Sequence, residues 1–144
     1  MKHLPKKIAV LMIVFILSTI MASGSGPESA ISMLVSQRTD IMNEYFSGNI
    51  LYKEAAERIG QIEKGRLLSE DLESMKEFFQ TDIEEITDYK IRKIDITDID
   101  ETLICAVVTI EWELYGTGGR ENIEEIYSVI AEKCKNSYKL VQFF

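Results

Sequence analysis

The sequence lacks the side chains that catalysis and metal binding use most. Its 144 residues contain one histidine, His3, and two cysteines, Cys105 and Cys134. Because His3 lies in the amino-terminal leader, no imidazole is left for a catalytic dyad or for activating a cysteine nucleophile. We therefore expect no catalytic residues, no bound metal and no cofactor.

Basic charge is also scarce. The chain has 16 lysines and arginines against 24 acidic residues, a net charge of -8, and removing the three lysines of the first 24 residues takes the remainder to -11. Nucleic acid and anionic lipid both require a basic surface. The composition therefore argues against a nucleic-acid partner and against peripheral binding to an anionic membrane. Its 46% hydrophobic and 28% charged residues are typical of a globular chain, and its length predicts one domain.

One long hydrophobic run is present, at the amino terminus. Lys2, Lys6 and Lys7 precede an apolar run over residues 8–17, followed by small residues up to Gly24. This layout is typical of a secretory signal or a single membrane anchor. The run is short for a spanning helix, which needs about 20 residues, and Ala22 with Gly24 resembles a cleavage site, so both alternatives stay open. The segment holds no cysteine, which excludes a lipoprotein. The lysines should stay in the cytoplasm. Residues 1–24 are thus a signal peptide or a transmembrane anchor, and residues 25–144 a single extracytoplasmic domain.

Three helices are predicted in the first half of that domain. Apolar residues at helical spacing predict a helix over 27–47, and the stripe that they form includes Arg38. Shorter helices are expected over 50–63 and from 70 to about 79. The residues expected to begin or end these helices, or one more short turn, are Pro27, Gly48, Asn49, Gly65, Ser69, and Thr81 with Glu84.

The hydrophobic period then changes from helical to alternating. Strands are predicted over 89–98, 103–115, 122–133 and 138–144, with a bulge near Arg92 where the alternation slips. Helices followed by an antiparallel meander predict an α+β fold. We expect three helices packed on a curled four-stranded antiparallel sheet, preceded by the hydrophobic amino-terminal helix.

The hairpin at Gly116-Thr-Gly-Gly119 sets a strand register, and this register predicts whether the two cysteines can form a disulfide. If Tyr115 opposes Arg120, Cys105 opposes Ile130, and Cys134 lies four residues further along the ladder, about 13 Å away. A disulfide requires Cα atoms within about 7 Å. The register therefore predicts two free thiols that serve as packing residues.

The element order, ending in Tyr138-Lys-Leu140, resembles the nuclear transport factor 2-like superfamily of cone-shaped α+β rolls. Such a fold hosts many functions. The resemblance implies an apolar cone, which in some members holds an aspartate base beside a tyrosine or a second acid. Type IV secretion systems contain a single-span component of this superfamily. Several short sequence segments also resemble those of small uncharacterised membrane-anchored proteins of clostridial bacteria. They are Tyr45-Phe-Ser-Gly-Asn49, Tyr52, Glu54-Ala55, Ile62-Glu-Lys64 and Ser69-Glu-Asp-Leu-Glu73.

The aspartates and tyrosines that could act as catalytic groups in such a cone do not form a convincing site. None of these residues is predicted in mid-strand on an apolar inward face, where a raised pKa would arise. The acidic turn that follows Asp95 has Leu103 where a calcium loop of the EF type needs glycine, which favours a solvated turn. The glycine-rich hairpin precedes a strand, so it is not a phosphate loop. The candidates are Asp88, Asp95 and Asp98 with Tyr89, Tyr127 and Tyr138.

Aromatic residues give the sequence its functional hypothesis. Trp112 is expected in the core, while Tyr115, Tyr127, Phe143 and Phe144 form a candidate partner surface on the sheet. The alternative is that they pack in the core and at the mouth of the cone.

We interpret the chain as an extracytoplasmic, membrane-tethered, non-catalytic domain. It would act in protein association, either with itself or by docking on a cell-envelope or secretion assembly. The alternative is a small-molecule-binding cone, isomerase-like or hydrolase-like. A cystatin-like inhibitor is disfavoured, because the hairpin from Tyr115 to Gly119 lacks the Gln-x-Val-x-Gly pattern of that family.

Overall fold

Three helices precede four strands in a computed structural model of the chain, which describes residues 26–77 and 85–144. The helices are α2 (Pro27–Phe46), α3 (Tyr52–Ile62) and α4 (Gly65–Glu77). The strands are β1 (Glu85–Ile99), β2 (Leu103–Gly116), β3 (Gly119–Cys134) and β4 (Ser137–Phe143). The predicted α+β class is confirmed. The predicted leader and the predicted turn at 81–84 lie outside the described residues.

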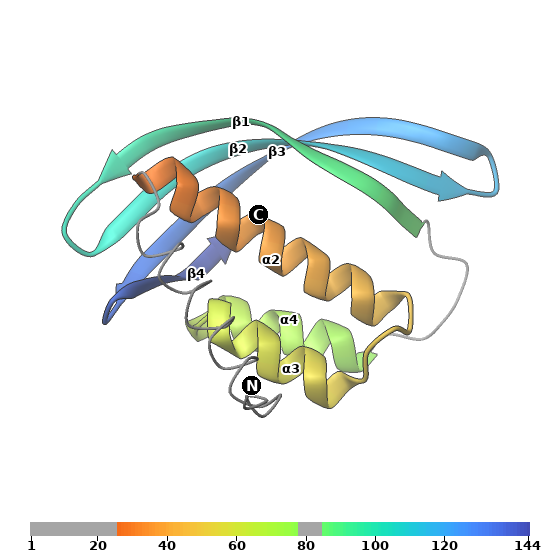
Figure 1. The fold of residues 1–144 in the computed structure, drawn as a ribbon, viewed down its shortest axis with the longest axis horizontal. Helices are drawn as coiled ribbons and strands as arrows, with labels where there is room; N and C mark the ends of the chain where they lie inside the picture. Colours follow the sequence, from red (N-terminus) through yellow and green to blue (C-terminus); the bar gives the residue numbers. More distant parts are fainter. Residues whose placement is uncertain (1–25, 78–84) are drawn as a thin grey trace, which may run out of the picture.

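The strands form one antiparallel sheet in the order β1-β2-β3-β4. The sheet is curled, and α2 crosses its concave side with α3 and α4 packed beyond it (Figure 1). We call the face toward the helices the helix-side face and the opposite one the outer face. Among the helices of residues 26–77, none is long and apolar enough to cross a membrane.

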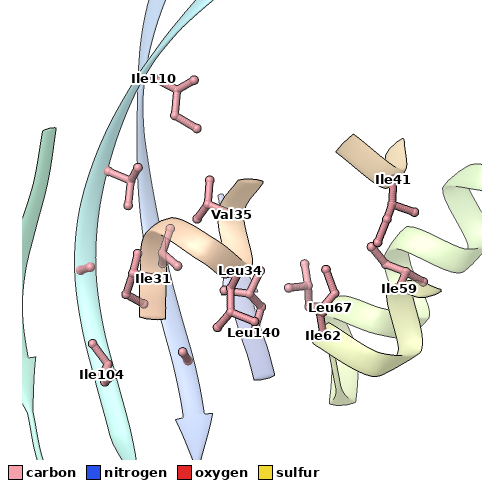
Figure 2. Close-up of a cluster of buried hydrophobic side chains, with 14 of the residues drawn as sticks. Ile31, Leu34, Val35, Ile41, Ile59, Ile62, Leu67, Ile104, Ile110 and Leu140 are labelled. Carbon is pink, nitrogen blue, oxygen red and sulfur yellow. The ribbon is translucent and has the colours of Figure 1, made fainter. Parts of the chain in front are cut away.

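The core lies between α2, the two shorter helices and the helix-side face. Every second residue of β2 is buried from Ile104 to Trp112, as the alternation predicts. Figure 2 shows Ile31 and Val35 of α2 beside the sheet, and Ile41 pointing toward Ile59 of α3. Each such fully buried side chain contributes about 1.5–3 kcal/mol of transfer free energy. The buried apolar residues are Ile31, Leu34, Val35, Ile41, Ala55, Ile59, Ile62, Leu67, Met75, Ile104, Ala106, Val108, Ile110, Trp112, Val129, Ala131 and Leu140.

The first helix follows the sequence closely, and the next two begin elsewhere. Gly48 follows α2 with a φ of 77°, the left-handed conformation that glycine takes at helix ends. The prediction that Asn49 caps the second helix is wrong, because the capping position of α3 is Leu51, which makes no side-chain cap hydrogen bond. The third helix begins at Gly65 rather than after Ser69. Its start is set by tertiary pairing, because the Lys64 amide donates to the Leu140 carbonyl at 3.0 Å and fixes the chain just before the turn.

The strand register is the predicted one. Tyr115 pairs with Arg120 and Cys105 with Ile130, and both cysteines are free thiols. The predicted bulge appears between Ile91 and Lys93, and β1 has two further register shifts. These shifts bend β1 so that it follows the curl of the sheet.

Candidate functional site

A buried group of charged side chains joins the three helices. Arg38, in the apolar stripe of α2, donates from Nε to Glu63 Oε1 at 2.9 Å. Its Nη2 donates to Asp71 Oδ2 of α4 at 2.7 Å. Glu63, directly after α3, has no exposed surface, and Asp71 is 9% exposed. We call Arg38, Glu63 and Asp71 the polar cluster.

The surroundings of Glu63 in the polar cluster favour its protonated form. Burial, and after it the charge of Asp71, raises the pKa of the Glu63 carboxyl to about 8 against the opposing effect of Arg38. Two ionised carboxylates around one guanidinium would leave a net negative charge in the interior, which is costly. A retained proton removes that charge. Within the described residues, Glu63 Oε2 has no hydrogen-bond partner.

A row of aromatic side chains crosses the helix-side face, with one ring from each strand. The row comprises Tyr89, Trp112, Tyr127 and Phe143. Successive ring centroids are 5.9, 6.2 and 4.6 Å apart. Trp112 Nε1 donates to the Tyr127 hydroxyl at 3.0 Å, and that hydroxyl donates to Glu125. Burial is the main reason that the pKa of Tyr127 rises to about 12.

Both ends of this aromatic row meet α2. The Arg38 guanidinium lies 4.4 Å from the Phe143 ring centroid, in cation–π geometry. At the other end, the Tyr89 hydroxyl donates to Asp40 Oδ1 at 2.9 Å. The polar cluster and the aromatic row thus hold α2 against the sheet. Since the Glu63 carboxyl has no exposed surface, this arrangement supports positioning rather than contact with a substrate.

The outer face has a different character. None of the described helices packs on it (Figure 1), and its side chains alternate along β2 and β3 with the buried ones. Ile126 is 69% exposed and Tyr115 54% exposed. Phe144, which is 74% exposed, exchanges two backbone hydrogen bonds with Ser128 and continues the row of β4. The apolar and small side chains of this face include Leu103, Cys105, Val107, Thr109, Tyr115, Ile126, Ser128, Ile130, Cys134 and Phe144.

The structure divides the four aromatic residues of the predicted partner surface between two faces. Tyr115 and Phe144 lie exposed on the outer face. Tyr127 and Phe143 lie half-buried on the helix-side face, where they stack on each other. The four residues therefore do not form one continuous patch. Tyr115 and Phe144 share only a face, because Phe144 pairs with Ser128, which lies opposite Val107 and far along β2 from Tyr115.

The carboxylates considered for cone chemistry lie away from the aromatic row. Asp88, Asp95 and Asp98 are exposed on β1, opposite outer-face residues of β2. Tyr138 is half-buried near the turn into β4. In residues 26–77 and 85–144, no three histidine, cysteine or acidic side chains converge as metal ligands.

The turn between β1 and β2 is organised by Asp100. Its carboxylate accepts hydrogen bonds from the amides of Thr102 and Leu103 at 2.6 and 2.8 Å. These bonds hold the pKa of Asp100 below its usual value. The carboxylate thus serves the local turn.

Sequence reasoning missed Glu63 and Asp71. Their available signal was Arg38, a charged residue inside an apolar stripe, which requires a buried counter-charge. Nothing in the local sequence distinguishes these two acids from the exposed acids around them. Only the packing of α3 and α4 on α2 selects them.

No protein-family model matches the chain, and no curated protein does. Among solved structures, the chain is similar to the intermembrane space region of the chloroplast protein ARC6, known from a crystal structure. The two are 14% identical, with a TM-score of 0.52 over 84% of this chain and 97% of that one. At this identity the likeness shows a related fold alone.

Proposed function

We propose that this chain is a non-catalytic protein-association domain that docks a protein partner through its sheet. The supporting observation is the outer face, which the described helices leave uncovered and which exposes Tyr115, Ile126 and Phe144. Ile126 and Phe144 are neighbours there, because Phe144 pairs with Ser128, two residues along β3 from Ile126. Adjacent exposed apolar side chains are typical of interaction surfaces.

The proposal places the domain outside the cytoplasm, tethered by residues 8–24. The basic residues before the apolar run support this topology. Intact-mass measurement on the native protein tests the tether. A mature chain beginning at Ser23 or Ser25 would make it a secreted domain and refute the tethered arrangement.

We also propose membership of the nuclear transport factor 2-like superfamily and kinship with small membrane-anchored clostridial proteins. The curled four-stranded sheet on three helices supports the first. The short segments around Tyr45 and Ile62 support the second. A solved structure of a protein with a closely related sequence from either group would test both proposals.

The association proposal is tested by recovery of partners from native envelopes. Ile126→Asp places a charge on the outer face without disturbing the core, because the side chain is exposed. We expect it to lower recovery of a specific partner at least tenfold. Leu51→Asp is the matched control, because Leu51 is 79% exposed on the helix side. Equal recovery with wild type and Ile126→Asp would refute docking through the outer face.

The helix-side aromatic row keeps a small-molecule site as the second candidate. It rests on Tyr127 and Phe143, which are half-buried and stacked. A ligand there would give a saturable rise in melting temperature with an apolar compound. If this site is the function, the size of the protein in solution should not depend on its concentration. Its size should also be the same in Ile126→Asp.

A further inference from the structure

The half of β3 nearest the hairpin has an open side. Strand β4 pairs with β3 from Val129 to Cys134, and Phe144 adds one more pair with Ser128. From Arg120 to Tyr127, β3 has β2 on one side and no described strand on the other. We call Arg120–Tyr127 the open β3 edge. All of its side chains are exposed except Ile123 and Tyr127, which are half-buried.

The backbone of this edge is ready to pair. In an antiparallel ladder, alternate residues direct both backbone groups to the same neighbour. The amide and carbonyl of Ser128 bond to Phe144, and the pairing of β2 with β3 has no register shift up to Gly119. By the same alternation, the backbone groups of Asn122, Glu124 and Ile126 point toward the open side. An added strand would therefore continue the row of β4 beyond Phe144.

The other sheet edges are protected. Strand β1 has three register shifts, which disrupt pairing along its length. Strand β4 is covered by the link between α3 and α4, where Lys64 bonds to Leu140 and Lys139 Nζ donates to the Gly60 carbonyl at 2.9 Å. The open β3 edge has neither a bulge nor a covering segment among the described residues.

The charge of this edge selects its occupant. Glu121, Glu124 and Glu125 form no ion pair among the described residues, and Glu124 lies opposite Glu111 of β2. Like charges directly opposite each other destabilise a ladder. Two copies paired through this edge would bring six glutamates together against two arginines. A strand with basic side chains on its helix-side face would instead place positive charge beside Glu121 and Glu125.

We propose that the open β3 edge binds an extended, lysine- or arginine-rich segment of a protein partner as an added β-strand. Backbone hydrogen bonds to Asn122, Glu124 and Ile126 hold the segment in register. On the helix-side face its basic side chains meet Glu121 and Glu125, which pair with Leu114 and Ile110 of β2. On the outer face an apolar side chain meets Ile126. This inference rests on the proposed association function and names the chemistry of the partner.

The test uses the full chain in neutral detergent micelles and a fluorescent ten-residue peptide that alternates lysine with valine. An otherwise identical peptide with glutamate is the charge control. We expect saturable binding of the lysine peptide that weakens with added salt. Amide exchange should slow at Asn122, Glu124 and Ile126, whose N–H groups gain an acceptor. The amides of Ile123 and Glu125 already face β2 and should change little.

Two pairs of variants sharpen the test. Reversing Glu121 and Glu125 to lysine should weaken binding more than tenfold. The control reverses Glu73 and Glu77, exposed glutamates of α4, which changes the net charge equally and should alter affinity less than twofold. Asn122→Pro removes one edge N–H without touching the β2 ladder and should also weaken binding tenfold. Asn122→Ala should not.

The outcomes separate the inference from the function on which it rests. Peptide binding without slower exchange at these three amides would show charge attraction alone and overturn strand addition. Absence of binding, or equal loss in both double variants, would overturn it as well. Protection of the same amides by raised protein concentration alone would make a second copy the occupant. In each case a partner lost specifically in Ile126→Asp would leave the association function standing.

Discussion

Replacing Glu63 by glutamine tests the physical state of the polar cluster. Glutamine keeps the shape of the protonated acid and removes the proton equilibrium. In the folded protein the pKa of Glu63 is about 8, whereas in the unfolded chain it is about 4.3. Between these values the folded state holds one proton that the unfolded state has released.

The sign of the effect follows from this difference. Because the folded state binds the extra proton, the free energy of unfolding falls as the pH rises through this window. The slope is at most about 1.4 kcal/mol per pH unit for one proton. From pH 5.5 to 7.5 the wild type should therefore lose up to about 2.8 kcal/mol. The loss should end above pH 8, where both states are ionised.

The assay is urea unfolding followed by the fluorescence of Trp112, the single tryptophan. Apart from His3 in the leader, the chain has no histidine that could titrate in this window. We expect Glu63→Gln to flatten the pH dependence and to be at least as stable as wild type at pH 7.5. Glu57→Gln, an exposed change on α3, should reproduce the wild-type slope. Parallel curves for wild type and Glu63→Gln would refute the retained proton.

Other substitutions address the remaining contacts. Arg38→Met should destabilise the fold by about 3–5 kcal/mol, because it leaves the Asp71 carboxyl without its charged partner and Glu63 Oε1 without its donor; urea midpoints at constant m-value check this. Ile110→Ala should cost about 2–5 kcal/mol by opening a cavity, whereas Ile126→Ala should stay within about 0.5 kcal/mol because that side chain is exposed. Tyr127→Phe removes the acceptor of the buried Trp112 Nε1 and should cost about 1–3 kcal/mol, with a shift of the Trp112 emission as a second readout.

Local signals were sufficient for much of the fold. The alternation of β2 and the glycine-rich turn determine the register, so the Tyr115–Arg120 and Cys105–Ile130 pairs followed from the sequence. A hairpin with a short turn fixes the pairing of its strands. Pro27 and Gly48 likewise set the ends of α2 through their own backbone preferences.

Features that depend on tertiary packing did not follow from the sequence. The start of α4 depends on the pairing of Lys64 with Leu140, residues far apart in the chain. The polar cluster depends on how α3 and α4 dock on α2. Which of Phe143 and Phe144 joins Tyr127 on the helix-side face depends on the register of β4, which shifts between Ile130 and Ala131. A one-residue shift moves side chains to the other face of a sheet.

Site-specific crosslinking in the native envelope tests the association function most directly. A photoreactive amino acid at Ile126 or Glu124 samples the outer face and the open β3 edge, while the same group at Glu57 or Glu73 samples the helix side. The account predicts adducts to a second protein from the first two positions, with a basic segment of that protein at the crosslink. Equal adducts from all four positions, or none from Ile126 and Glu124, would contradict it.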